Sequence, residues 1–582
     1  MPKNKITLAC LVLAVLPFAA AADVEEIIVS ATGLPTPAAQ IGASVDVLDA
    51  ADLEGLVYLH DALPSLGVNV PQSGGAGTQS NVFLRGLPGR HTDLIIDGIS
   101  MFDPNFNQVL WQDVTTDGVG RIEVLRGSHG VLYGSNAVAG VVSQFTEIGG
   151  ARAHNARAEY GRFDTRRLVL SGKGGTAGGI AYGYAVSDLK TGGISAVEAD
   201  DGNREANGYE NRQFNGRADI PLGRGVVLEL AGRFGEGEAD IDGGFPLADK
   251  RGAGQKFDRR AARVGVVFER GGDRFRIDAT DYDSRIDHIE NDRTANTTEA
   301  ARRLWAYRGE VALDDGVQLV FGFERQDEEY DSGVATFEAD NVAALALLQW
   351  TPRPPLTLTG AVRRDRHDAF GGETTYRLTA ALAAGEMWRW RLAYGTGYRA
   401  PSLSELYLPV FGNPDLAPET SVSREVGVDF TPAAQIETAL TLFEIEIEDV
   451  IGYDPATFRN TQIDGTTRSR GVEWTGRWSP DAAFDVRLRI AYTDSDKPAA
   501  DNSGATEREV RVPRWQGGFE LGWRPHDRLE VDLGVRRVRD VVDVGGVALD
   551  DYTLARVAAR YCLLYTSPSP RDATLSRMPS SA

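Results

Sequence analysis

The chain has 582 residues, of which 61 are basic and 83 acidic, so its formal net charge is −22. This length exceeds one ordinary domain, and we expect either two domains or one very large one. The acidic balance argues against a nucleic-acid-binding protein, which needs a basic surface to meet phosphate. Hydrophobic residues make up 42% of the chain, a proportion typical of soluble proteins that membrane strands of alternating polarity also produce.

The first residues have the pattern of a secretory signal peptide. Lys3 and Lys5 precede a short apolar run from Ile6 to Phe18, and Ala20–Ala22 offers small residues for cleavage. We therefore expect residues 1–22 to be a signal peptide. The apolar run is shorter than the roughly 20 residues of a membrane-spanning helix. No apolar run of about 18 residues follows it in the sequence. An exported chain of this kind is periplasmic, secreted or an outer-membrane barrel.

The next stretch indicates a short extended segment followed by a small domain. Residues 23–34 begin with acidic residues and contain the β-branched run Ile27–Val29. Residues 35–149 mix apolar residues with turn signals, which predicts an α+β domain in which Asp52–Leu66 has helical character. Short strands are expected at Asn81–Arg85, Asp93–Ile96 and Ile122–Leu125.

Four sequence blocks follow one another in this domain, and each alone would indicate only a strand or a turn. They are Asn81–Gly86, Asp93–Gly98, Arg121–Gly127 and Tyr133–Val142. In this order and spacing they resemble the plug domain of TonB-dependent outer-membrane receptors. The plug positions that the resemblance assigns are Arg85, Gly86, Asp97, Gly98, Glu123, Arg126, Gly127, Tyr133, Gly134 and Ser135.

The same resemblance gives residues 23–34 a function. They are similar to the family's TonB box, a segment that can add as a strand to the sheet edge of a partner. The implied partner is TonB, acting with ExbB and ExbD; an ordinary first strand of the plug is the alternative. The residues of this coupling segment are Glu25, Glu26, Ile27, Ile28, Val29, Ser30, Ala31 and Thr32.

From residue 150 to residue 561, segments of alternating polarity recur between clusters of Gly, Pro, Asp and Asn. In Val226–Phe234, one face is apolar and the other carries Glu229 and Arg233. This period of two gives a strand a lipid-facing side and a lumen-facing side. We therefore predict a membrane β-barrel of about 22 antiparallel strands in the bacterial outer membrane, with the plug in its lumen. A soluble β-propeller or sandwich is the alternative.

Two later stretches, Tyr398–Gly427 and Arg470–Glu473, are similar to barrel motifs of the same family. The resemblance thus covers residues 23 to about 561. From the motif positions we expect Arg85 and Arg126 to form ion pairs with carboxylates of the barrel wall, because a charge inside a lumen needs a partner. The candidate carboxylates are Glu419, Glu425 and Glu473.

The C-terminal end departs from the family pattern. Tyr552–Tyr561 alternates like a normal strand, whereas residues 562–582 lose the alternation and are rich in Ser, Pro and Arg. Family members usually end on further strands and a terminal aromatic residue. We expect residues 562–582 to be a non-native tail that stands in place of one or two closing strands, so that the barrel is incomplete; a disordered natural tail is the alternative.

The sequence contains no recognisable catalytic pattern: no His-Glu-x-x-His, Walker-type glycine loop or Gly-x-Ser-x-Gly turn. We therefore expect a transporter and not an enzyme, with no covalent cofactor and a monomeric state in outer-membrane lipid. The plug and the coupling segment favour energy-driven import of a bulky, scarce ligand. A passive porin or a surface adhesin is the alternative from another class, but neither needs a plug.

Within the family, the chain resembles the cobalamin receptors, in which acidic loops after the third and fifth barrel strands bind calcium. Flexible acidic loops provide the oxygen ligands that Ca²⁺ prefers. The resemblance implies cobalamin as the small-molecule ligand, with a ferric siderophore as the alternative. Acidic surface loops are also common in any chain of this charge, which is the alternative to a metal site. The implied calcium ligands are Glu198, Asp200, Asp201, Asp242 and Asp249.

Overall fold

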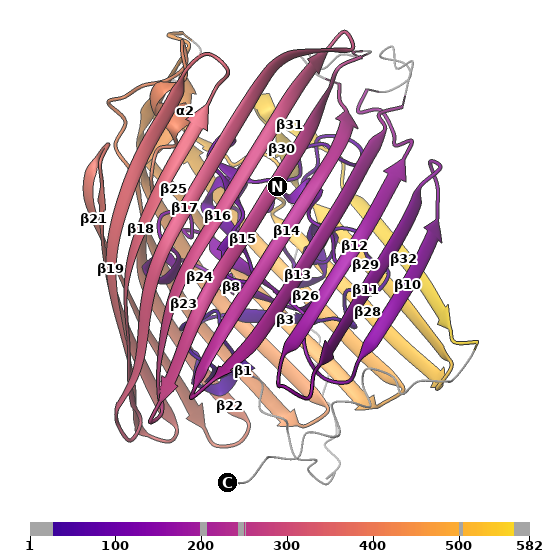
Figure 1. Cartoon of the computed structure of the whole chain (residues 1–582), viewed down its shortest axis with the longest axis vertical. Helices are drawn as coiled ribbons and strands as arrows, with labels where there is room; N and C mark the ends of the chain where they lie inside the picture. Colours follow the sequence, from indigo (N-terminus) through magenta and orange to yellow (C-terminus); the bar gives the residue numbers. More distant parts are fainter. Residues whose placement is uncertain are drawn as a thin grey trace, which may run out of the picture.

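A long, strongly tilted sheet forms the wall of the molecule, and the N-terminal domain lies inside it, between the magenta strands at the front and the orange strands at the back (Figure 1). The structure, a computed structural model, describes residues 27–197, 206–242, 250, 252–454, 456–499 and 504–563. The expected signal peptide, most of the expected C-terminal tail and six expected site residues lie outside these described residues. Those six are Glu25, Glu26, Glu198, Asp200, Asp201 and Asp249.

The wall is a 21-stranded antiparallel sheet whose neighbouring strands follow one another in the chain. This agrees with the predicted barrel of about 22 strands. The short strand β27 and the long β28 both pair with β26, and within the described chain β10 and β32 are the two edge strands. The strands are β10 (Ala153–Tyr160), β11 (Arg166–Gly175), β12 (Ala181–Thr191), β13 (Tyr209–Gly223), β14 (Val226–Asp240), β15 (Gly254–Arg270), β16 (Asp273–Glu290), β17 (Arg293–Asp314), β18 (Val317–Asp331), β19 (Thr336–Arg353), β20 (Leu356–His367), β21 (Gly371–Ala384), β22 (Trp388–Arg399), β23 (Glu419–Ala433), β24 (Ile436–Asp454), β25 (Arg459–Asp481), β26 (Phe484–Pro498), β27 (Thr506–Arg508), β28 (Trp515–His526), β29 (Leu529–Arg539) and β32 (Tyr552–Tyr561).

The two faces of the wall differ as the alternation predicts. On β14, Phe234 is 49% exposed on the outer face, whereas Glu229 and Arg233 are 5% and 7% exposed on the inner face. Exposed tryptophans also gather near the strand ends that carry short turns, where aromatic rings suit the boundary between lipid and water. They are Trp350, Trp388, Trp478 and Trp523.

The long connections of the wall all lie at the same end, which distinguishes its two ends. Two-residue turns such as Gly271–Gly272 and Ala434–Gln435 join strands at one end. The opposite end carries the long connections, including residues 192–208 after β12, residues 241–253 after β14, and residues 400–418, which contain the helix α2 (Leu403–Tyr407). The two loops expected to bind calcium therefore leave the barrel on the same side.

The plug is built on a five-stranded mixed sheet with the order β3-β8-β9-β4-β5, in which β4 and β9 are parallel. Ile122 and Val124 of β8 are completely buried and belong to one core cluster with Ile445 and Ile447 of the barrel wall, so the plug and the barrel share a core. The plug strands are β1 (Ile27–Ile28), β2 (Thr36–Pro37), β3 (Val45–Asp49), β4 (Thr92–Ile96), β5 (Ile99–Ser100), β6 (Phe102–Asp103), β7 (Gln108–Val109), β8 (Val119–Arg126) and β9 (Gly140–Thr146).

The helical elements are short. Besides α2, they are α1 (Gly130–Tyr133) and the 3-10 turns η1 (Ala38–Gln40), η2 (Leu59–Asp61), η3 (Leu63–Leu66), η4 (Gly89–His91), η5 (Trp111–Asp113) and η7 (Val544–Gly546). The last of these joins the strands of a hairpin, β30 (Val541–Asp543) and β31 (Val547–Leu549). No helix among the described residues is both long and apolar enough to cross a membrane.

One local prediction for the plug holds in part and one is wrong. Asp52–Leu66 has helical character only in the two 3-10 pieces η2 and η3, because Gly55, with φ +78°, interrupts the segment. Asn81–Arg85 makes only isolated bridges, since the chain turns at Arg85 and Gly86, both with positive φ. The other two predicted strands correspond to β4 and β8.

Candidate functional site

Two buried arginines of the plug reach the carboxylates of the barrel wall. Nη1 of Arg85 lies 2.7 Å from Oε2 of Glu425, and its Nη2 lies 3.0 Å from Oε2 of Glu473. Nη1 of Arg126 lies 2.7 Å from Oε1 of the same Glu473. The structure therefore brings together both arginines and two of the three carboxylates expected from the motifs.

The plug adds a carboxylate of its own to this group, Asp46 of β3. Asp46 accepts from Nε of Arg126 at 2.8 Å, and its other oxygen lies 2.7 Å from Nη2 of Arg489 on the barrel. Burial alone would raise the pKa of Asp46, but Arg489 and Arg126 hold it well below its ordinary range. Burial likewise opposes the charge on Arg85, but Glu473 and Glu425 outweigh it and raise the pKa of Arg85.

Glycines bring the plug backbone close enough for these contacts. Gly86 has φ +75°, and a Cβ there would lie 2.8 Å from Cγ2 of Thr493 on the barrel wall. Gly127 has φ +82°, and a Cβ there would lie 3.0 Å from Oγ of Ser423. Only glycine fits both the left-handed backbone and the narrow space. Each motif arginine is thus followed by the residue that lets its backbone approach the wall.

Glu419 belongs to a different group from the one expected. Its Oε2 lies 2.7 Å from Nε2 of His91 on the plug, and its Oε1 lies 2.6 Å from Nη2 of Arg399 on β22. It forms no ion pair with Arg85 or Arg126 within the described chain. Burial lowers the pKa of His91, and the opposing effect of the Glu419 carboxylate is too small to offset it. The partners of Glu419 in the plug are therefore His91 and, with its Nε 4.0 Å from Oε1 of Glu419, Arg90.

Asp97 and Gly98 form the tight turn between β4 and β5, where both residues have positive φ. The Asp97 carboxylate accepts from the backbone N–H of Thr146 at 2.9 Å and from its hydroxyl at 2.5 Å. From the barrel, Arg263 donates to the Asp97 carbonyl at 2.9 Å. Burial raises the pKa of Asp97 in spite of these bonds. This motif pair fixes a turn and one more contact with the wall.

The described part of the coupling segment is docked on the plug. Ile27 pairs with Pro37 and Ile28 pairs with Thr36. The carboxylate of Glu123 on β8 accepts from the backbone N–H groups of Val29 at 3.3 Å and Ser30 at 3.0 Å.

Two more plug side chains hold the same segment. Arg121 donates to the Ile27 carbonyl and the Tyr133 hydroxyl donates to the Ser30 carbonyl, both at 2.8 Å. Burial raises the pKa of Tyr133 above its ordinary range. The motif residues Glu123 and Tyr133 therefore bind the coupling segment.

The remaining expected residues have local roles. Ala31 and Thr32 are buried, and the Thr32 hydroxyl lies 2.7 Å from that of Thr36. Gly134 ends α1 with φ +81°, and the Ser135 hydroxyl donates to the side chain of Asn136.

Of the five expected calcium ligands, only Asp242 is described. Its carboxylate accepts from the Ser195 hydroxyl at 2.8 Å and from the backbone N–H groups of Ala196 and Lys250, each at 3.2 Å. Asp242 thereby joins the loop after β12 to the loop after β14. The described residues contain no group of three or more side chains that could hold a metal ion, so the calcium site stays a prediction.

Several residues that hold the plug were not predicted. Asp46 sits in an otherwise ordinary strand, and Ser44, which donates to Glu425 from both its backbone and its hydroxyl at 2.8 Å, has no sequence signal at all. Arg399 lies in Tyr398–Gly427, the stretch similar to a barrel motif, but the resemblance assigns it no contact with the plug. Glu123 is a charged residue among the apolar residues of β8. This pattern was the one sequence signal that pointed to a buried polar contact, here with the coupling segment.

Both domains match known families. Residues 37–141 match the family described as TonB-dependent Receptor Plug Domain, and residues 191–567 match the family described as TonB dependent receptor-like, beta-barrel.

Relatives and solved structures agree on the kind of protein and differ in ligand. The vitamin B12 transporter of Vibrio vulnificus is 24% identical over 553 residues, which cover 92% of this chain and 88% of the relative. The vitamin B12 transporter of Photobacterium profundum is 26% identical over 561 residues, which cover 92% of this chain and 89% of that relative. A mutant ferric enterobactin receptor from Pseudomonas aeruginosa, solved with enterobactin, has a TM-score of 0.76 at 18% identity, covering 90% of this chain and 93% of that one. The siderophore receptor PirA from Acinetobacter baumannii also has a TM-score of 0.76, at 16% identity, covering 90% of this chain and 92% of that one.

We predict that Glu473→Gln lowers the free energy of plug unfolding by roughly 3 kcal/mol, because it leaves Arg85 and Arg126 with buried, weakened pairings. Urea unfolding of the plug, followed by proteolysis in detergent, measures the change. The matched control is Glu444→Gln, which removes a carboxylate paired with Arg424 on the exposed face and should change stability by less than about 0.5 kcal/mol. Equal effects of the two substitutions would contradict the assignment.

Asp46 makes plug stability depend on pH. Because its pKa is lowered in the folded protein, its contribution is present above the unfolded value of about 4 and is lost as the pH falls below that value. The same urea assay at pH 3 and pH 6 should show a fall in stability at pH 3. Asp46→Asn should be less stable at pH 6 and lose less on acidification. A variant that acidification weakens as much as the wild type would show that another group is responsible.

Proposed function

The chain belongs to the family of TonB-dependent receptors, and we propose that the small molecule it carries across the bacterial outer membrane is a cobalamin. The family works as outer-membrane transporters, which agrees with the barrel and the enclosed plug. The observation that carries the ligand assignment is the similarity to two vitamin B12 transporters, each aligned over 92% of this chain. A ferric siderophore is the second candidate, because the solved structures that match this fold include siderophore receptors.

The coupling segment is the proposed contact with TonB, which acts with ExbB and ExbD. Two features support this role. Ile27 and Ile28 are already in a strand conformation, and Ile27 and Val29 are exposed on one side of the segment. A short extended segment can add as a strand to the sheet of a partner once its backbone is released from the plug. Pulling on it would act first on the contacts with Arg121, Glu123 and Tyr133.

The calcium site is proposed in the two long loops after β12 and β14. Support comes from the topology, because both loops leave the same end of the barrel and Asp242 already bonds across them. The other proposed ligands are Glu198, Asp200, Asp201 and Asp249. Several carboxylates close together repel one another, and a divalent cation would neutralise that repulsion and order the loops.

We predict that Ile28→Pro abolishes uptake and leaves ligand binding at the cell surface intact. Proline removes a backbone donor from the segment that TonB is proposed to grip. Uptake and surface binding of radiolabelled cobalamin, measured on the same cells, separate the two steps. Because Ile28 is buried, Ile28→Val serves as the control that keeps the backbone donor and most of the packing. Normal uptake by the proline variant would disprove the coupling role.

Isothermal titration of the full chain in detergent tests the ligand and the metal together. We expect cyanocobalamin to bind, with an affinity that rises when calcium is added and falls on chelation. Asp200→Ala combined with Asp201→Ala should remove the calcium dependence. Asp188→Ala, on the exposed face of β12 beside Arg212, should retain it. Heat from a ferric siderophore, with none from cobalamin and no effect of calcium, would reject both proposals.

A further inference from the structure

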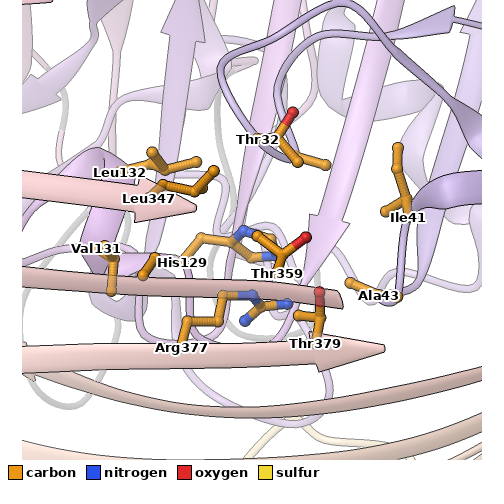
Figure 2. Close-up of a pocket in the computed structure, with 13 residues that line it drawn as sticks. Thr32, Ile41, Ala43, His129, Val131, Leu132, Leu347, Thr359, Arg377 and Thr379 are labelled. Carbon is orange, nitrogen blue, oxygen red and sulfur yellow. The ribbon is translucent and has the colours of Figure 1, made fainter. Parts of the chain in front are cut away.

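A small cavity lies where the coupling segment, the plug and the barrel wall meet (Figure 2). Ala31 and Thr32 line it from the coupling segment, Ile41–Ala43 and His129 from the plug, and residues of β19, β20 and β21 from the barrel. Its volume is ≈ 20 Å³, which is enough for about one particle of the size of a water molecule. Phosphate and organic ligands are too large for it.

His129 is the plug's polar group in this cavity. It is only 1% exposed, and neither ring nitrogen has a hydrogen-bond partner among the described residues. Burial, assisted by the charge of Arg377, lowers its pKa well below the ordinary value, although the carbonyl of Arg126 acts in the opposite direction. The ring is therefore neutral, with one N–H to donate. Figure 2 shows it beside Thr359 and close to the guanidinium of Arg377.

Arg377 on β21 is the barrel's charged group in the cavity. It is 8% exposed, and its Nη1 donates to the carbonyl of Ser128, the residue before His129. Within the described part of the chain, it forms no ion pair with a carboxylate at 4.0 Å or less. A buried guanidinium without a counter-charge is costly, so this position favours an anion.

The neighbouring ion pairs have no carboxylate to spare for Arg377. They form one connected group in which five arginines share four carboxylates. Its members are Arg85, Arg126, Arg389, Arg391 and Arg489 with Asp46, Glu425, Asp429 and Glu473. This group thus carries one more positive than negative charge, and Arg377, which is near enough to interact with Glu425 and Arg85 of the group, adds to the excess.

The sheet register places hydroxyl groups beside the two nitrogen-bearing side chains. Thr359 pairs with Thr379, and Ala361 pairs with Arg377, so all four point to the lumen on adjacent strands and line the cavity. Guanidinium, imidazole N–H and hydroxyl groups can all donate hydrogen bonds. A ligand that only accepts, carries one negative charge and is small enough would satisfy them.

We propose that this cavity binds one monovalent inorganic anion of the size of chloride, held between Arg377 and His129. A water molecule could accept the same hydrogen bonds, but it would leave the guanidinium charge uncompensated. The bound anion would join the plug to the barrel directly behind Ala31 and Thr32 of the coupling segment. The site is independent of which small molecule the receptor imports.

Anomalous diffraction from crystals of the wild-type protein grown in bromide tests the site without any substitution. The expected result is one anomalous peak in the cavity, within contact distance of the guanidinium of Arg377 and the ring of His129. Absence of a peak there, while bromide occupies other surface positions, would overturn the proposal.

Thermal stability tests whether the anion binds in solution. At constant ionic strength, the melting temperature of the wild type should be higher in chloride than in gluconate, which is too large for the cavity, by about 2–4 °C. Arg377→Gln should lose this difference. Thr379→Val, a milder change that serves if the first variant folds poorly, should reduce it. Arg364→Gln, which removes an arginine from the outer face of β20, should keep it. A wild-type difference near zero, or one that persists in both cavity variants, would overturn the proposal.

Discussion

The fold depends on charge pairing across the boundary between the plug and the inside of the barrel. A barrel of this width has a polar inner face, so a domain that fills it must meet charged side chains that have lost water. Each such charge is tolerable only when a partner is in place. The condition is met by two plug arginines, Arg85 and Arg126, which pair with Glu425 and Glu473 of the wall. The charges are reversed in another pair, where Asp46 of the plug meets Arg489 of the wall. The apolar core shared by β8 and β24 adds burial to the same interface.

The coupling segment is attached in a weaker way. Its contacts are hydrogen bonds from Val29 and Ser30 to one carboxylate, two further bonds from Arg121 and Tyr133, a two-residue strand pairing, and the burial of Ile28 and Ala31 in a small core cluster. Hydrogen bonds to a charged group such as the Glu123 carboxylate contribute about 1.5–3 kcal/mol each, whereas leaving one partner of a buried ion pair without the other costs about 3–5 kcal/mol. The segment can therefore detach while the arginine pairs keep the plug in place. This difference in strength is what a receptor pulled from one end requires.

The sequence predicted the elements that depend on short-range chemistry and failed where a distant contact decides. Alternation along β14 identified its outer and inner faces, because the period of two is a local property of a strand. Motif positions identified both arginines, but Glu419 proved to pair with His91 and Arg399, since no pattern along the chain records which barrel residue faces which plug turn. Asp46 and Ser44 were missed for the same reason. The helical character expected at Asp52–Leu66 is confined to two 3-10 pieces, because Gly55 has φ +78° and interrupts the segment.

The central claim is that the coupling segment opens without release of the plug. Hydrogen exchange of individual amides in the wild-type protein tests it most directly, because it reports the free energy of each opening. The account predicts that the amides of Val29 and Ser30 exchange much faster than those of Val124 and Leu125 in β8, and that Glu123→Gln accelerates the first pair alone. Equal protection of both pairs, or a parallel loss of protection in the variant, would show that the segment and the plug open as one unit.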